Sequence, residues 1–143
     1  MKKRTTRFRT KLTSRLRPPF RCVECDGESC LATGDVLFGR SAEDRLYWLC
    51  RCGAYIGCLR GTDLPSGLPA GRRTKMARIE AHAAFDLLWK KHGIPRTEAY
   101  RMLASHFEIT FHDCHFGSMG LKACREAIQW TNNIIADLNH EPT

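Results

Sequence analysis

The sequence predicts an α+β fold in which a small cysteine-rich β region precedes a helical region. Three observations lead to this prediction. Short runs of aromatic and β-branched residues, separated by glycines and cysteines, fall within residues 22–60. A segment rich in glycine and proline, 61–71, then interrupts the β pattern. Within residues 72–139, apolar residues recur at spacings of three and four, which is typical of helices with one buried face.

Residues 1–21 form a basic N-terminal arm by composition. They contain nine Lys and Arg residues and no acid, and the pair Pro18-Pro19 marks a boundary because proline cannot continue a helix. The chain holds 23 basic and 15 acidic residues, so 14 basic residues remain against 15 acids in residues 22–143. The net charge of +8 therefore belongs to the arm, and the body carries a net charge of −1.

The β region contains three pieces with strand composition. Aromatic and aliphatic residues dominate each of them, and glycines or cysteines stand between them. We expect a small antiparallel sheet formed by residues 36–38, 46–49 and 54–56.

Three helices are predicted over 72–91, 97–107 and 119–138. Gly93 and Pro95 end the first of them. Thr97 and Ser118 are the expected N-caps of the second and third. On the first helix the predicted buried stripe consists of Met76, Ile79, Ala83 and Leu87, widened by Phe85, Leu88 and Trp89.

The composition excludes two broad classes of protein. With 43% hydrophobic and 27% charged residues the chain is not disordered throughout. It has no apolar run of the roughly 18 residues that a membrane span needs. No apolar core follows the charged N-terminus, so we expect no export signal and a reducing, cytoplasmic setting. In such a compartment clustered cysteines more often bind metal than form disulfides.

The strongest chemical signal is a pair of cysteine motifs. Cys22 and Cys25 form a C-x2-C motif, and Cys50 and Cys52 form a C-x-C motif further along the chain. Zn2+ takes four thiolates in a tetrahedron, and two such turns from neighbouring hairpins can supply them. Period-2 geometry would put both thiols of the C-x-C pair on one face of a strand.

The fourth zinc ligand has alternatives in the sequence, and Cys50 is favoured over Cys58 or Cys30. Gly27 and Gly53, just after each pair, suit the tight turns that such a site needs. The alternative is that these cysteines are small buried hydrophobic residues.

Cys114, His115 and Cys124 form a second candidate metal site in the helical region. The simpler interpretation of Cys124 is packing, because it lies on the apolar face of its helix. Cysteine–histidine catalysis is disfavoured, since adjacent residues point apart and no third orienting group is evident. We therefore expect a protein without enzymatic activity.

Several motifs, in order along residues 22 to about 128, carry a family resemblance. They include Cys52-Gly53-Ala54-Tyr55-Ile56-Gly57, a helix motif with Ala81-His82, Phe85-Asp86 and Trp89-Lys90, and Cys114-His115-Phe116-Gly117. In these motifs the chain resembles phage- and prophage-encoded zinc-finger-containing proteins, whose domain has no assigned function. The family's second knuckle would place a cysteine at Leu49, where this chain has Cys50 one residue later. The resemblance implies zinc and a phage or prophage setting within a bacterial host, and supplies no activity.

These observations give a domain organisation. Residues 1–21 are the arm, and residues 22–143 form a single zinc-containing domain. That domain has a zinc-ribbon-like part, 22–60, and a helical part, 72–139.

Basic residues in two places suggest contact with a polyanion. Neutralising Z phosphates of duplex DNA gives a salt slope near −0.9Z, so full engagement of the arm would give a slope of order −8. Cations at the start of the helix over 72–91 oppose its dipole, which suggests that an anion compensates them. The candidate nucleic-acid contacts are Lys2, Lys3, Arg4, Arg7, Arg9, Lys11, Arg15, Arg17, Arg21, Arg72, Arg73, Lys75 and Arg78.

The arm has other interpretations. Phe8, Leu12 and Leu16 could form an amphipathic helix of a transit peptide or a membrane-surface segment, which the phage resemblance disfavours. The arm could also be a solubility tail, or could fold against an acidic protein.

Three functional hypotheses follow. The first is a zinc-containing protein that binds DNA or RNA, as a phage regulatory factor. The second is a phage factor that binds a host protein machine, such as RNA polymerase or a defence enzyme, without catalysis. The third is a small metal-dependent nuclease, which is disfavoured because Asp86 and Asp113 are single acids rather than a paired acid–base set.

Overall fold

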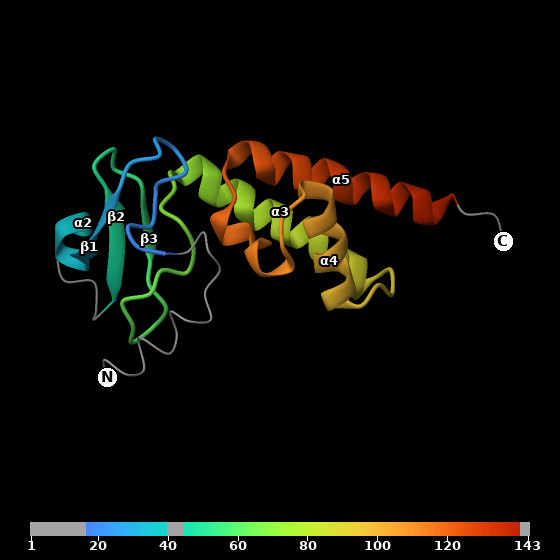
Figure 1. The fold of residues 1–143 in the computed structure, drawn as a ribbon, viewed down its shortest axis with the longest axis horizontal. Helices are drawn as coiled ribbons and strands as arrows, with labels where there is room; N and C mark the ends of the chain where they lie inside the picture. Colours follow the sequence, from blue (N-terminus) through green and yellow to red (C-terminus); the bar gives the residue numbers. More distant parts are fainter. Residues whose placement is uncertain (1–16, 40–44, 141–143) are drawn as a thin grey trace. The chain divides into compact units, whose positions relative to one another are not determined.

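The computed structural model describes residues 17–39 and 45–140 and divides the chain into two compact units. The first ends at Arg72 and the second begins at Arg73. We call the first, over its described residues 17–39 and 45–72, the metal unit, and the second, 73–140, the helical unit (Figure 1). That residues 22–143 fold as a single domain stays a prediction.

The metal unit contains a three-stranded antiparallel sheet in the order β1-β2-β3. Its strands are β1 (Ser29–Thr33), β2 (Leu46–Cys50) and β3 (Tyr55–Gly57). Ser29 lies opposite Cys50, and Leu49 lies opposite Tyr55. Helices follow the sheet along the chain, so the predicted α+β class is confirmed.

Residues 36–38 were predicted to be extended, and that prediction is wrong. They belong to a short helix, α2 (Gly34–Phe38), which ends at Gly39 with a left-handed φ of 73°. Phe38 lies edge-on to Tyr47 and Tyr55, with ring centroids 5.4 and 5.9 Å apart, so tertiary packing outweighs its strand preference. The missing strand is β1, which has the weakly patterned sequence Ser-Cys-Leu-Ala-Thr.

The core of the metal unit begins with Phe20, which is fully buried. Its ring meets that of Trp48 edge-on at 4.7 Å, and the indole N–H of Trp48 donates to the Asp63 carbonyl at 2.7 Å. Leu64 and Leu68, from the predicted loop 61–71, are also buried. The loop has no helix or named strand, as predicted, but it supplies core side chains.

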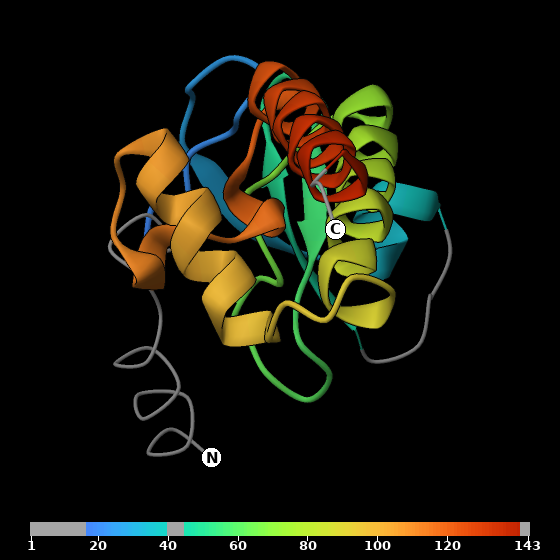
Figure 2. The ribbon, with the colours of Figure 1, turned by 90° about the vertical axis from the view of Figure 1, so that its right-hand side faces the viewer.

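The helical unit consists of three helices and two short 3₁₀ turns, shown from a second side in Figure 2. The helices are α3 (Arg72–Lys90), α4 (Arg96–Phe107) and α5 (Leu121–Asn139). The two turns are η1 (Phe111–Asp113) and η2 (Phe116–Ser118). The predicted helices are therefore confirmed, with small shifts at their ends.

The expected caps are not the ones used. Pro95 precedes α4 and Gly120 precedes α5, and neither makes a side-chain capping bond. The hydroxyl of Ser118 instead donates to the His115 carbonyl at 2.9 Å, in the preceding turn.

The buried face of α3 differs in part from the predicted one. Met76 and Ile79, expected to be buried, are 51% and 65% exposed. The buried face is turned toward a core built around the small residues at 77 and 81, which allow neighbouring elements to approach closely. Its members are Ala77, Ala81, Phe85 and Leu88, packed with Leu103, Phe116, Cys124 and Ala127.

Among the described residues, no helix combines the length and the apolar character needed to cross a membrane.

Candidate metal centre

The first knuckle is a tight turn over residues 22–27. The N–H of Cys22 donates to the Gly27 carbonyl at 2.9 Å, and that of Asp26 donates to the Cys22 carbonyl at 2.8 Å. Asp26 has a positive φ of 59°. The N–H of Glu24 donates to the Cys22 Sγ at 3.3 Å, so the turn directs a backbone dipole at this sulfur.

Gly27 has a steric role in the first knuckle. A Cβ at this position would lie 3.1 Å from Cys25 Sγ and 3.4 Å from Cys50 Sγ. The missing side chain therefore leaves room for two sulfurs from different parts of the chain. Gly27 lies in a tight turn, as predicted, but the residue of this turn that has a positive φ is Asp26.

The second knuckle lies at the turn between β2 and β3. Cys50 is the last residue of β2, its N–H donates to the Ala54 carbonyl at 2.8 Å, and the N–H of Gly53 donates to the Cys50 carbonyl at 2.9 Å. Gly53 has a φ of 99°, a conformation that favours glycine. The expectation of two thiols on one strand face is wrong, because Cys52 lies in the turn, where the backbone reverses.

The two knuckles bring four sulfurs together. The Sγ atoms of Cys22, Cys25, Cys50 and Cys52 all lie within 4.8 Å of one another. Cys22 and Cys52 are 3.7 Å apart, and Cys25 and Cys50 are 3.4 Å apart. Neither pair is a disulfide, which would require about 2.05 Å.

These distances fit a zinc ion. A tetrahedral ion with Zn–S bonds of about 2.3 Å separates its sulfurs by about 3.8 Å. Four cysteine thiolates are also the donor set of structural zinc sites. Because four protein ligands leave no position for water or substrate, the role that this geometry supports is to hold the fold together.

The electrostatics of the site also call for a cation. Burial raises the pKa of the Cys22 thiol to about 12, although the N–H groups of Cys25 and Glu24 favour its thiolate. The N–H of Ala54 lowers the pKa of Cys52. A metal ion supplies the charge that lets the buried sulfur ionise, since a coordinating thiol is deprotonated outright.

The structure places Cys50 in the cluster and leaves out the two alternative ligands. Cys58 is buried at the other end of the β2–β3 pair, and burial raises its pKa to about 11. Cys30 is exposed on β1. Over residues 17–39 and 45–140, the four-cysteine cluster is the one group of three or more His, Cys, Asp or Glu side chains that lie close enough to share an ion.

Cys114, His115 and Cys124 are accordingly not brought together as a second site. Cys114 and Cys124 are buried in the core of the helical unit, whereas His115 is exposed. The reason is the alternation of side chains at neighbouring positions, which sends Cys114 inward and His115 outward. Burial raises the pKa of Cys114 to about 11, as expected for a packed thiol.

Sequence reasoning missed two polar contacts that anchor the first knuckle. The carboxylate of Glu24 accepts from the Gly71 N–H at 2.9 Å, and the Val23 N–H donates to the Pro69 carbonyl at 3.0 Å. Both partners lie beyond β3 in the sequence, far from the first knuckle, so no local pattern could have indicated them.

The candidate nucleic-acid contacts divide into three groups. The first seven, Lys2 to Arg15, lie outside the described residues. Arg17, Arg72 and Arg73 are exposed. Lys75 is half-buried, and burial together with Arg78 lowers its pKa to about 8.

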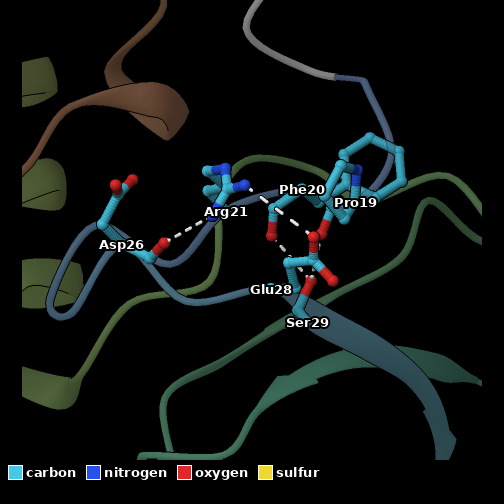
Figure 3. Close-up of polar contacts among 6 residues, drawn as sticks. All are labelled: Pro19, Phe20, Arg21, Asp26, Glu28 and Ser29. Atoms are coloured by element: carbon cyan, nitrogen blue, oxygen red, sulfur yellow. Dashed lines mark hydrogen bonds and ion pairs between the residues drawn. The ribbon is translucent and has the colours of Figure 1, made fainter.

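Arg21 and Arg78 have structural contacts. Arg21 donates to the Asp26 carbonyl at 2.8 Å and lies 3.8 Å from the Glu28 carboxylate (Figure 3). Arg78 is 7% exposed, and its Nε donates to the Met119 carbonyl at 2.9 Å. The prediction of Arg78 as a phosphate contact is therefore corrected, because its guanidinium is buried against the loop that precedes α5.

The chain enters the first knuckle through a small polar cluster, drawn in Figure 3. The buried Ser29 hydroxyl contacts two carbonyl oxygens, that of Phe20 at 2.6 Å and that of Pro19 at 3.1 Å. The residues around Phe20 thus pack with the metal unit, although the sequence assigned them to the arm.

A three-stranded sheet with a four-cysteine cluster, followed by helices, defines a zinc-finger-containing protein. A family model described as a zinc-finger-containing domain, DUF3268, matches residues 18–134, and the chain belongs to this family. The match confirms Zn2+ as the cofactor. No match to the chain was found among curated proteins or among solved structures.

Proposed function

We propose that this protein binds nucleic acid, as a phage or prophage regulatory factor whose zinc site is structural. The observation that carries the proposal is the distribution of charge. Nine basic residues fall in the first 21, whereas residues 22–143 are nearly neutral. Such a segment binds phosphates by releasing counterions, without needing a shaped pocket.

The described residues support a modest role for the body in this binding. Arg17, Arg72 and Arg73 are exposed and can contact phosphates, whereas Arg21 and Arg78 already have protein partners. The main contribution is therefore assigned to the seven basic residues from Lys2 to Arg15. The zinc ion, fully coordinated by cysteines, would hold the fold and would not take part in chemistry.

The test measures binding of a labelled DNA duplex and of single-stranded RNA between 50 and 200 mM salt. A full-length variant with seven substitutions to Gln, at Lys2, Lys3, Arg4, Arg7, Arg9, Lys11 and Arg15, should lower the duplex salt slope by about six. The control variant, Lys122→Gln with Arg125→Gln, removes exposed charges on α5 and should leave the slope nearly unchanged. Equal binding by the variant with seven substitutions and by the unaltered protein would contradict the proposal.

A second candidate function is binding to a protein partner. A separate observation favours it: apolar side chains are exposed on α3, where the sequence pattern had predicted burial.

A further inference from the structure

We infer that the exposed face of α3 is a docking surface for an acidic amphipathic helix of a partner protein. The surface, which we call the α3 face, consists of Arg72, Arg73, Met76, Ile79, Ala83 and Lys90. This inference is independent of nucleic-acid binding by the arm.

The α3 face has the spacing of a helix-binding site. Met76, Ile79 and Ala83 follow one another at intervals of three and four, so they form one stripe about 10 Å long. All three are exposed, Met76 by 51% and Ile79 by 65%. The core of the helical unit instead uses the opposite side of α3, through Ala81, Phe85 and Leu88. The stripe is thus a second apolar face, which folding of the helical unit leaves in water.

The charges at the ends of the stripe define its partner. Arg72 and Arg73 begin the helix, and Lys90, whose Nζ lies 4.0 Å from the Asp86 carboxylate, ends it. The first turn holds no acid, and neither arginine has an ion-pair partner within the described part of the chain. Because these arginines oppose the helix dipole, a carboxylate beside them would gain from the dipole and from both cations. Glu80 is the one acid among the exposed residues of α3.

Charge complementarity disfavours a second copy of this chain as the occupant. In a parallel pair of α3 helices the arginines at each start would meet one another. In an antiparallel pair they would meet Lys90 and Lys91 of the other copy. Either arrangement places like charges in contact at both ends, which is destabilising.

A nucleic acid is also a poor match for the α3 face. Phosphates and sugars could pair with the arginines, but they would gain little from burying Met76 and Ile79. An amphipathic helix with apolar residues at matching spacing and glutamates toward its ends satisfies both features, in the helix-to-helix mode common in peptide recognition.

The probe for this inference is a labelled synthetic peptide long enough for roughly four helical turns. It carries leucines at helical spacing in its middle and glutamates at both ends. A twin carries lysines in place of the glutamates, and a third peptide has the acidic composition in a scrambled order. Fluorescence anisotropy with the full chain should show binding of the acidic amphipathic peptide, with the other two at least about tenfold weaker.

Variants locate the binding on α3. Ile79→Glu should weaken the acidic peptide by about tenfold or more, because it removes an apolar anchor and adds a like charge. Asn132→Glu, which makes the same charge change at an exposed position of α5, should leave affinity unchanged. Met76→Glu is the second variant, and circular dichroism verifies the helical content of all three. Arg73→Glu should reduce the preference for the acidic peptide over the lysine twin.

Four results would overturn the inference. They are no binding of the acidic peptide, equal binding by Ile79→Glu and the unaltered protein, displacement of the peptide by duplex DNA, and a concentration-dependent dimer that Ile79→Glu abolishes. Retention of nucleic-acid binding by Ile79→Glu would separate this surface from the proposed function of the arm.

Discussion

The eight cysteines of this protein fall into three chemical classes. Four lie together as zinc ligands, and three others, Cys58, Cys114 and Cys124, are buried away from the cluster. Burial raises the pKa of each of these three, to about 11 for Cys58 and Cys114. Cys30 is exposed on β1. Each class should therefore react differently with a thiol reagent.

We predict stepwise thiol titration with Ellman's reagent at pH 8. One thiol, Cys30, should react quickly in the zinc-loaded protein, since it is the exposed cysteine outside the cluster. A chelator should expose the four ligands as well, and a denaturant should release the last three. At this pH the buried thiols stay protonated, because their raised pKa values lie above it. A Cys30→Ser variant is the control and should lose the first step alone; four or more fast thiols in the loaded protein would contradict the assignment.

The zinc content itself gives a second prediction. Elemental analysis should find about one zinc per chain, and Cys22→Ser should lose most of it, since a structural site with three thiolates binds zinc far less tightly. Cys30→Ser should keep the full content. A metal-free protein whose three-stranded sheet stays folded would contradict the structural role of the ion.

Gly57 is a position where one added carbon atom should change the stability of the protein. A Cβ there would lie 2.5 Å from the guanidinium of Arg45, whose Nε donates to the Cys58 carbonyl at 3.2 Å. Gly57→Ala should therefore lower the free energy of unfolding by about 1 kcal/mol, as Arg45 gives way. In an Arg45→Ala background the same change should cost less, and urea titrations of the double-mutant cycle measure the difference. Equal costs in both backgrounds would show that Arg45 is not the obstacle.

At the scale of elements, the helices were predictable, but the buried face of α3 was predictable only in part. Gly93 and the spacing of apolar residues predicted a helix over 72–91, and α3 runs from Arg72 to Lys90. Which side of α3 is buried depends on partners far along the chain, such as Leu103 and Cys124. Phe85 and Leu88 are buried as predicted. Met76 and Ile79, also predicted to be buried, are exposed, and the core uses Ala77 and Ala81 in their place.

Dependence on distant partners also explains why one strand was predicted and another was missed. The aromatic run of β2 signals its conformation locally, whereas β1 has no such run and is defined by its pairing with β2. The C-x2-C motif was readable because both ligands lie on one turn. The place of Cys50 in the cluster depends on the turn between β2 and β3, whose shape the C-x-C spacing alone does not determine.

The core of the helical unit gives an element-scale prediction. Phe85 is fully buried on α3 and lies against Tyr100 and Phe116, with ring centroids 4.7 and 5.3 Å away. Phe85→Ala should lower the free energy of unfolding by about 3–5 kcal/mol through the cavity it leaves. Ile79→Ala, an exposed position on the same helix, should cost less than about 1 kcal/mol. Thermal or urea unfolding followed by circular dichroism compares the two, and similar losses would mean that the stripe is buried after all.

At the scale of the whole molecule, metal and core are separated along the chain. Every ligand of the cluster lies in the metal unit, and the main hydrophobic cluster uses residues from Ala77 onward. From the sequence, the helical part was expected to begin at residue 72, and the structure divides the chain between Arg72 and Arg73. The net positive charge is separated from both, since most of it lies before residue 17.

We expect a chelator to act on the metal unit first. Removing zinc should abolish the ordered sheet, because the bonds from the ion to four sulfurs are what hold the two knuckles together. Helical ellipticity at 222 nm should persist, since no ligand belongs to α3, α4 or α5. Re-addition of zinc is the control and should restore the sheet. Simultaneous loss of helix and metal would show that the two units fold as one.

The hydrogen bond from the Gly71 N–H to Glu24 has a consequence for how zinc loading could be detected. Glu24 lies between two zinc ligands, and Gly71 directly precedes α3, so this amide reports on a metal held by a much earlier part of the sequence. Its exchange with deuterated solvent should be slow in the loaded protein and fast after zinc loss. The order imposed by the ion thus reaches the residue before α3, and the first turn of that helix begins from an anchor that depends on zinc.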